Sequence, residues 1–303
     1  MPVNSDPVTH GLWAATAPIE PQTTNLRVSL RADVAIVGAG YTGLSAALNL
    51  AEAGAKAVVI EANGIGFGGA GRNVGLVNAG MWVMPDELPR VLGPVHGDRL
   101  LNALGDGPKE VFARVDKHAI PCELRREGTL HCAVGEAGVK ELREREAQWR
   151  ARGADVRLLD AAETAQMVGT RAYPAALLDK RAGTIQPLAY ARGLAKAAIA
   201  AGADIYTQSP VTHIEAAGEG WRVVTAGGSV TARRVIMATD AYTHLTSGDL
   251  WDIIRKAQVR LPYFNAATAP LPADIVRSIL PQGQGAWDTA EVLSSFRLDA
   301  AGR

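Results

Sequence analysis

Residues 31–75 read RADVAIVGAGYTGLSAALNLAEAGAKAVVIEANGIGFGGAGRNVG, and this stretch decides the fold of the chain. It holds an apolar, β-branched run at 32–37, a G-x-G-x-x-G turn at 38–43, helically spaced apolar residues over 41–53 and a second apolar run at 56–60. A strand, a glycine turn, a helix and a second strand in this order predict a βαβ unit that binds a dinucleotide.

Each residue of this motif has a separate physical reason. Gly38 permits the tight turn, Gly40 lets the backbone approach a pyrophosphate at the helix N-terminus, and Gly43 lets the helix pack closely on the strand. Glu61, at the end of the second strand, can accept hydrogen bonds from a ribose 2′-hydroxyl and would repel a 2′-phosphate. The alternative is a βαβ turn without a ligand, and the agreement of strand, helix and terminal acid favours the dinucleotide site.

Composition limits the function classes. The chain has 303 residues, 48% of them hydrophobic, which suggests about two domains. Its 31 basic and 31 acidic residues balance, so nothing favours nucleic acid or an anionic membrane. Cys122 and Cys132 make no disulfide framework, and the N-terminus lacks the pattern of a signal peptide. We therefore expect a cytoplasmic protein without membrane or nucleic-acid partners.

The order of elements predicts an α/β fold with inserted antiparallel strands, so the nucleotide-binding domain is expected to be discontinuous in sequence. The expected division is an N-terminal arm at 1–30, a discontinuous nucleotide-binding domain at 31–85 plus 180–250, and a second domain at 86–179 plus 251–303. We expect Trp13 to anchor the arm. The glycine density over 62–80 argues against a regular element there.

Patterns elsewhere predict further elements. Helices are expected over 86–118 with a break near 105–107, and over 136–152, 187–201 and 272–280. Strands are expected near 122–126, 129–134, 175–179, 204–206, 210–216, 221–225, 229–231, 234–239, 257–268 and 292–298. Asp160 and Glu163 have the spacing of a capping box. The i,i+4 pairs Glu141/Arg145 and Glu146/Arg150 predict a solvated face of the helix at 136–152.

The motif at 32–43, Glu61 and the run Gly68-Gly-Ala-Gly-Arg-Asn73 together resemble the D-amino-acid oxidase superfamily of FAD-dependent oxidoreductases. Within it, the chain is most similar to the branch of bacterial amine oxidases typified by γ-glutamylputrescine oxidase. That branch commonly reads G-[AG]-S-G-R-N-G-G after the ribose-binding acid, where this chain has Ala70 and Val74 at the serine and one glycine. Similar segments occur at 13–18, 187–195, 209–212, 235–239, 268–272 and 296–299.

The resemblance implies FAD as the cofactor. It also implies that the nucleotide-binding domain is a Rossmann-like, glutathione-reductase-type FAD-binding domain, with an inserted α+β substrate domain on a mixed or antiparallel sheet, and it implies a set of residues that hold FAD. That set is Gly38, Ala39, Gly40, Tyr41, Thr42, Gly43, Glu61, Ala62, Gly68, Ala70, Arg72, Asn73, Val74, Val211, Ala238 and Thr239. The implied reaction is hydride transfer from the amine-bearing carbon of a small-molecule amine or amino acid to the flavin, with reoxidation by oxygen. It requires no catalytic nucleophile, and we assign no catalytic residue.

The resemblance also implies further segments beyond Arg303 that complete the substrate domain, so we expect a truncated substrate domain and leave open a homo-oligomer or a complementing chain. Two alternatives remain. Truncation, Ala70 and Val74 are compatible with a catalytically impaired FAD- or nucleotide-binding remnant. The glycine motif alone also fits an NAD-dependent dehydrogenase, although the second glycine-rich loop after Glu61 argues against it.

Some remaining side chains attract functional interpretations. We expect Met81, Trp82, Tyr263 and Phe264 to pack in the interior rather than to face a substrate. The spacing of His118, Cys122, His131 and Cys132 matches no common metal motif, and adjacent strand residues point to opposite faces, so we expect no metal site. His213 and His244 have no identifiable partner in the sequence.

Overall fold

The computed structural model describes residues 11–245, 254, 256–259, 261 and 263–303. The chain divides into two compact units, each built from segments that lie far apart in sequence. Unit 1 consists of Met1–Asn73, Ile120–Cys122 and Pro187–Asn265; unit 2 consists of Val74–Ala119, Glu123–Gln186 and Ala266–Arg303. The functional domain limits drawn from the sequence stay a prediction.

Unit 1 holds a six-stranded mixed sheet with the order β8-β2-β1-β11-β10-β9. The first four strands run parallel, and β10 and β9 extend the sheet as antiparallel strands. The strands are β1 (Ser29–Val37), β2 (Ala57–Ile60), β8 (Asp204–Tyr206), β9 (Val211–Ala217), β10 (Gly220–Thr225) and β11 (Ser229–Met237). The helical elements are α1 (Leu12–Thr16), α2 (Tyr41–Glu52), η1 (Gly69–Gly71), α7 (Pro187–Ala200) and η2 (Asp240–Leu245).

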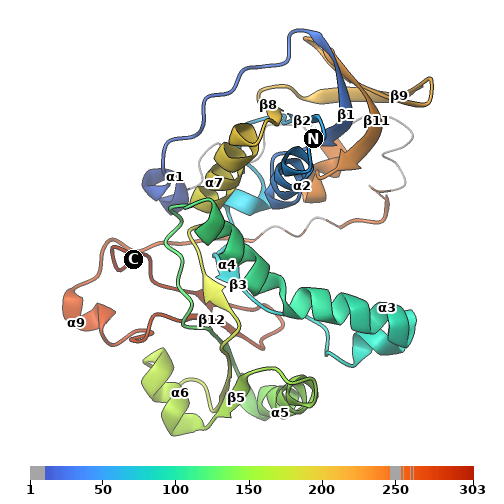
Figure 1. The fold of residues 1–303 in the computed structure, drawn as a ribbon. Coiled ribbons are helices and arrows are strands. Elements are labelled where there is room, and N and C mark those ends of the chain that lie inside the picture. The colour runs from blue at the N-terminus through green and yellow to red at the C-terminus, as the bar shows by residue number, and fades with distance from the viewer. Residues whose placement is uncertain (1–10, 246–253, 255, 260, 262) are drawn as a thin grey trace. The chain divides into compact units, whose positions relative to one another are not determined.

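The βαβ unit predicted from residues 31–61 is confirmed. The side chains of Leu44, Ala47, Leu48 and Ala51 are buried on one face of α2, as the helical spacing predicts. Gly54 follows the helix with φ 81°, a left-handed conformation that favours glycine at a helix end. Figure 1 shows α2 and α7 side by side next to the parallel strands.

Unit 2 contains a five-stranded sheet with the order β13-β12-β4-β6-β5, in which only β12 and β4 pair in parallel. Its strands are β4 (Thr129–Cys132), β5 (Val156–Leu159), β6 (Ala176–Asp179), β12 (Gly285–Asp288) and β13 (Ser295–Phe296). A separate pair joins β3 (Leu76–Val77) to β7 (Gly183–Thr184). The helices are α3 (Glu87–Gly105), α4 (Gly107–Lys117), α5 (Gly135–Ala151), α6 (Ala161–Val168) and α9 (Ala273–Val276). The predicted α/β fold with a second, mixed-sheet domain is confirmed.

Several local predictions are confirmed by particular contacts. The Asp160 carboxylate accepts the Glu163 N–H at 2.8 Å, and the Glu163 carboxylate accepts the Asp160 N–H at 3.2 Å, so the capping box opens α6. The break between α3 and α4 lies at the predicted place. Trp13 is buried and donates from its indole Nε1 to the Asn73 carbonyl at 2.9 Å, which anchors the arm.

Other predictions of secondary structure are wrong. No strand forms over 122–126, where Arg125 makes only an isolated bridge to Thr184. The two strands expected at 229–231 and 234–239 are one continuous strand, β11. The described residues of 257–268 form no strand, and residues 260 and 262 lie outside the description. The strands β3, β5, β7 and β12 were not predicted, because they are short and lack a distinct period. The short helix η1 and the strand β3 also lie within 62–80, where the glycine density argued against a regular element.

The interpretation of α5 as a simple solvated face is also wrong. Both predicted pairs exist, at 3.0 Å for Glu141–Arg145 and 3.6 Å for Glu146–Arg150. However, the Arg145 side chain is 6% exposed, whereas that of Arg150 is 68% exposed. Arg145 points inward and donates to the backbone carbonyl oxygens of residues 81–83.

This contrast predicts very different effects for two substitutions on one helix. Arg145→Met removes donors from three carbonyl groups, so we expect it to lower the free energy of unfolding by about 3 kcal/mol. Arg150→Met breaks a pair of the same spacing at the surface and serves as the control, with an expected change below about 0.5 kcal/mol. Urea unfolding of both variants measures the difference, and equal effects would contradict a structural role for Arg145.

Large apolar side chains predicted to pack inside are in fact exposed. Met81, Trp82, Tyr263 and Phe264 all belong to the exposed class. Cys122 and Cys132 are buried and form no disulfide bond. Among the described residues, no helix has the length and apolar character needed to span a membrane.

Candidate dinucleotide site

The glycine turn lies between the end of β1 and the start of α2. Gly38 has φ 108°, and a Cβ there would lie 2.4 Å from the carbonyl oxygen of Ala238. Ala238 in turn donates its N–H to the Val37 carbonyl at 2.9 Å, so the turn packs directly on the end of β11. Only glycine fits this position, because of both its φ and the neighbouring backbone.

The other two glycines of the motif differ sharply in their surroundings. A Cβ on Gly43 would lie 1.9 Å from the Gly38 carbonyl oxygen, so Gly43 is required by the packing of helix on turn. A Cβ on Gly40 would meet only the Ala70 Cβ, at 3.7 Å, which is an ordinary contact. The protein therefore leaves space beside Gly40, where a ligand can approach the backbone.

The N-terminus of α2 is uncapped by any side chain of the described residues. Gly40 is the N-cap residue and has no side chain to offer to the amides of the first turn. The first N–H groups of a helix have no partner within the helix and carry partial positive charge. This end of α2, which begins with Tyr41 and Thr42, is thus suited to a phosphate group.

Glu61 lies beside this turn, directly after β2. Its Oε2 accepts the Ala39 N–H at 2.7 Å, and its Oε1 accepts the Asn63 N–H at 2.8 Å. Burial raises the pKa of Glu61, while the N–H groups of Ala39, Asn63 and Ala62 lower it and the Glu20 carboxylate raises it. The residue as a whole is half-buried although its carboxylate is enclosed. A carboxylate held next to the glycine turn can accept hydrogen bonds from the hydroxyl groups of a ribose.

The second glycine-rich loop is organised by Asn73. Its side-chain amide donates to the carbonyl oxygens of Gly69 and Ala70, both at 3.0 Å, and to the Tyr41 hydroxyl at 3.2 Å. The Arg72 guanidinium carbon lies 4.5 Å from the centroid of the Phe67 ring. The loop that includes Gly68 is therefore tied to the first residue of α2.

The remaining predicted residues lie around this core. Ala62 is exposed after Glu61, and Thr239 follows Ala238, its hydroxyl 2.7 Å from that of Thr243. Val211 begins β9, and the preceding Ser209 donates its N–H to the Glu61 carbonyl at 2.9 Å. A cavity of about 460 Å³, lined in part by Ser209 and Pro210, lies beside this segment. Val74 follows the loop as the first residue of unit 2.

Several contributors were not predicted from the sequence. Glu20 accepts the Ile65 N–H at 2.8 Å, and the Tyr242 ring would be 2.9 Å from a Cβ on Gly68. Asp240, in the turn after β11, has φ 45°, a conformation that aspartate tolerates better than most residues. For Asp240, its position directly after a predicted strand was the one local signal in the sequence. Glu20 and Tyr242 have no such signal, because only the tertiary fold brings them to this loop.

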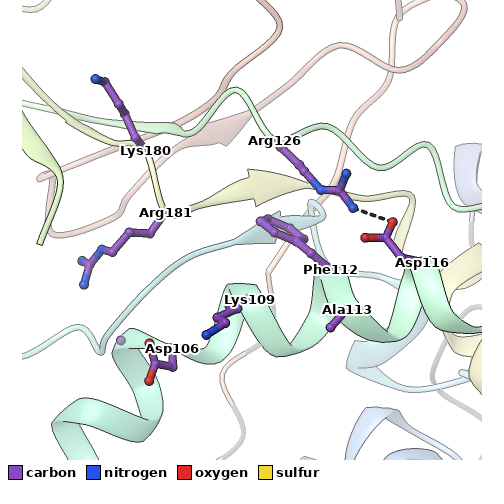
Figure 2. Close-up of a pocket in the computed structure, with 9 residues that line it drawn as sticks. Asp106, Lys109, Phe112, Ala113, Asp116, Arg126, Lys180 and Arg181 are labelled. Atoms are coloured by element: carbon purple, nitrogen blue, oxygen red, sulfur yellow. Dashed lines mark hydrogen bonds and ion pairs between the residues drawn. The ribbon is translucent and has the colours of Figure 1, made fainter.

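Unit 2 contains a separate cavity of about 530 Å³, shown in Figure 2. Its labelled lining includes Lys109 and Phe112 from α4 and Arg126 opposite them, with Arg126 paired to Asp116 at 2.6 Å. Two other basic side chains of the lining form ion pairs with carboxylates that do not line the cavity. These pairs are Lys180 with Asp155 and Arg181 with Asp179. None of the predicted cofactor residues lines this cavity.

The residues considered for a metal site have other surroundings. His131 stacks on the Trp287 ring, with centroids 3.5 Å apart, and Cys132 is buried in the apolar core. His213 lies 3.8 Å from the Glu215 carboxylate, and the His244 side chain lies outside the described part. Among the described residues, no group of three His, Cys, Asp or Glu side chains has metal-binding geometry.

Comparisons with known proteins show which family the chain belongs to. The family model described as FAD dependent oxidoreductase, DAO, matches residues 33–303. The chain is 35% identical to Gamma-glutamylputrescine oxidoreductase of Escherichia coli, over 97% of this chain and 68% of that protein. It is 32% identical to the Haemophilus influenzae protein named "Probable oxidoreductase OrdL", over 90% of this chain and 63% of that protein. The chain thus spans about two thirds of the length of these relatives.

Structural similarity leads to the same family. The crystal structure of glycine oxidase from Geobacillus kaustophilus matches with a TM-score of 0.59 and 26% sequence identity, over 69% of this chain and 55% of that one. The resemblance drawn from the glycine motifs is therefore confirmed at the level of family and fold. The chain belongs to the DAO family of FAD-dependent oxidoreductases.

Proposed function

We propose that unit 1 holds FAD with its pyrophosphate at the N-terminus of α2 and its adenosine ribose on Glu61. The observation that carries this proposal is the space beside Gly40 at an uncapped helix end, next to an acid at the end of β2. The residues present fit the cofactor, since the N–H groups of the first turn of α2 would be available to the phosphates and the Glu61 carboxylate would be available to the ribose.

The second glycine-rich loop, from Gly68 to Val74, is the proposed neighbour of the flavin end. Asn73 holds the backbone of this loop through Gly69 and Ala70. Arg72 supplies a positive charge from the same loop, for a phosphate or for charge that develops near the flavin. Val211, Ala238 and Thr239 are proposed to line the adenosine and pyrophosphate side.

The proposed activity is the oxidation of a small-molecule amine or amino acid by a cytoplasmic enzyme. When bound, FAD supplies the acceptor for a hydride from the amine-bearing carbon, and oxygen reoxidises it. The names of two relatives, an oxidoreductase of γ-glutamylputrescine and a glycine oxidase, support an amino compound as the substrate. The protein's own contribution is binding, orientation and charge rather than a covalent nucleophile.

The visible spectrum of the purified chain tests this function. We expect the absorption bands of an oxidised flavin, which bleach under anaerobic conditions when a suitable amine or amino acid is added. Readmitted oxygen should restore the bands and produce hydrogen peroxide. A bound flavin that no member of a broad amine and amino-acid panel bleaches would contradict the oxidase and support a non-catalytic FAD-binding protein.

Glu61 gives a prediction in which ligand binding and stability move in opposite directions. Glu61→Gln should weaken FAD binding by about tenfold, because a charge-assisted hydrogen bond to the ribose becomes a neutral one. Burial raises the pKa of Glu61 in the FAD-free protein, so the folded state binds this proton more tightly than the unfolded chain.

The resulting contribution to stability is present below the unfolded pKa of about 4.3 and is lost as pH rises through the folded pKa. Without FAD, we therefore expect the unfolding free energy of the parent chain to fall relative to that of Glu61→Gln as pH rises from about 4 to 7. Urea unfolding at several pH values measures this difference, and a change in the opposite direction would refute the assigned environment of the carboxylate.

A further inference from the structure

The segment Met81-Trp82-Val83 of unit 2 presents large apolar side chains to solvent. Trp82 is 66% exposed, and its two neighbours are more than 40% exposed. The segment follows Gly80, which has φ 86° and whose added Cβ would be 2.5 Å from the Trp149 ring. The backbone that leads into the segment is thus fixed by packing, while Trp82 itself remains open.

A buried arginine holds this segment in place. Arg145 donates to the carbonyl oxygens of Trp82 at 2.9 Å and of Val83 at 3.1 Å, and more weakly to that of Met81 at 3.4 Å. Its charge is paired with Glu141 at 3.0 Å. Burying a guanidinium is costly unless its donors are satisfied. Both terminal nitrogens of Arg145 make these bonds, whereas its buried Nε has no hydrogen-bond partner among the described residues. Arg145 therefore acts as a positioning residue that keeps an exposed tryptophan in one place.

The Trp82 ring belongs to an aromatic cluster. It makes a T-shaped contact with Trp287, with ring centroids 5.5 Å apart and an interplanar angle of 79°. Trp287 stacks on His131 at an angle of 8°, and the two residues are register partners on the parallel strands β12 and β4. The sheet therefore fixes one ring of the cluster, and Arg145 fixes the segment that carries the other.

The imidazole that stacks on Trp287 carries no positive charge at neutral pH. Burial and the neighbouring Arg145 lower the pKa of His131 to about 3, so the imidazole under Trp287 is neutral at neutral pH. Arg145 has its own counter-ion in Glu141. The face of an indole ring attracts cations, and tryptophan is the most effective aromatic residue for this contact.

We propose that Trp82 and Trp287 form a recognition site for an alkylammonium group, the chemical class to which an amine substrate belongs. The two perpendicular rings, one of them largely exposed and held by a dedicated buried arginine, present an aromatic surface to a cation. This inference rests on the proposed function for its substrate class. It adds a location and a physical basis for selecting the charged amine.

The test uses the whole chain labelled with 5-fluorotryptophan and observed by ¹⁹F NMR, which reports on the six tryptophans separately. Butylammonium chloride is the probe, and 1-butanol is the neutral control of the same chain length. Trp82→Phe and Trp287→Phe assign the two signals, and Trp221 in β10 of unit 1 is the internal reference. We expect butylammonium, but not butanol, to shift the Trp82 and Trp287 signals.

Two substitutions separate cation recognition from plain apolar contact. Trp82→Leu keeps an apolar side chain but removes the ring, and we expect about tenfold weaker butylammonium binding, followed through the Trp287 signal. Trp82→Phe keeps a ring and should bind only about two- to threefold more weakly than the parent. Equal responses to butanol and butylammonium, or unchanged binding in Trp82→Leu, would overturn the inference.

The flavin absorbance of the same samples keeps the two claims distinguishable. If the protein contains flavin but butylammonium does not shift the Trp82 and Trp287 signals, the recognition site is refuted and the proposed function still stands. A colourless protein that still binds butylammonium at these signals refutes FAD binding and supports the site. A steady-state comparison should show a raised KM for the amine with little change in kcat for Trp82→Phe.

Discussion

Gly40→Ala should cost the chain its FAD while leaving its fold intact. An alanine Cβ at this position meets only Ala70 at 3.7 Å, and the backbone of Gly40 has φ −84°, which any residue adopts. We therefore expect the unfolding free energy to change by at most about 1 kcal/mol, the usual cost of alanine at a helix N-cap. The methyl group instead occupies the space through which a pyrophosphate approaches the backbone.

The expected loss of FAD affinity in Gly40→Ala is about tenfold or more, measured by titration of flavin fluorescence. Urea unfolding without FAD provides the stability of the same variant. Gly107→Ala in α4 is the matched control, because its Cβ would meet nothing within 4 Å and it lies outside unit 1. Unchanged FAD affinity in Gly40→Ala would show that the cofactor does not approach this turn.

Gly43→Ala should instead destabilise the fold itself. Alanine in a helix is ordinarily about 1 kcal/mol more favourable than glycine. Here the added Cβ would lie 1.9 Å from the Gly38 carbonyl oxygen and 3.3 Å from the Ala238 Cβ. Since backbone atoms cannot yield as a flexible side chain does, α2 must move away from the sheet.

We expect Gly43→Ala to lower the free energy of unfolding by about 3 kcal/mol, with FAD binding lost as a consequence. Thermal and urea unfolding of the FAD-free protein measure the first effect directly. Stability equal to that of the parent chain would mean that the close contact between α2 and the turn is absent in solution. Together, the two substitutions show which glycine is needed for FAD binding, namely Gly40, and which is needed for the stability of the fold, namely Gly43.

The parts predicted best from sequence are those whose causes are local. The run from β1 through α2 to β2 carries its own signals, namely apolar spacing, a glycine turn and Gly54 at the helix end. The same holds for the capping box at Asp160 and Glu163, where both partners lie within one turn. A pattern within a few residues is visible to any local interpretation.

The failures involve partners far away in sequence. Arg145 has the i,i+4 spacing of a surface pair, but its additional acceptors lie 62 to 64 positions earlier, so its burial was not predictable from α5 alone. β12 and β4 are likewise distant in sequence, and each is only four residues long. Trp82 was expected to pack inside because large apolar side chains usually do.

The candidate site divides in the same way. Gly38, Gly40, Gly43 and Glu61 follow from one motif with a known physical role for each member. The family resemblance, rather than spacing, added the second loop with Arg72 and Asn73. Residues such as Glu20 and Tyr242 had no signal, because only the fold brings them to the loop at 64–68.

The most direct test of the central claim is the flavin content of the chain. The protein is incubated with excess FAD, separated from free cofactor by gel filtration, and its absorbance spectrum is recorded before and after denaturation. The account predicts about one FAD per chain, released intact on denaturation. It also predicts a clear loss of that flavin in Gly40→Ala, with an unfolding free energy within about 1 kcal/mol of that of the parent chain. A parent chain that stays folded but retains no FAD would contradict it.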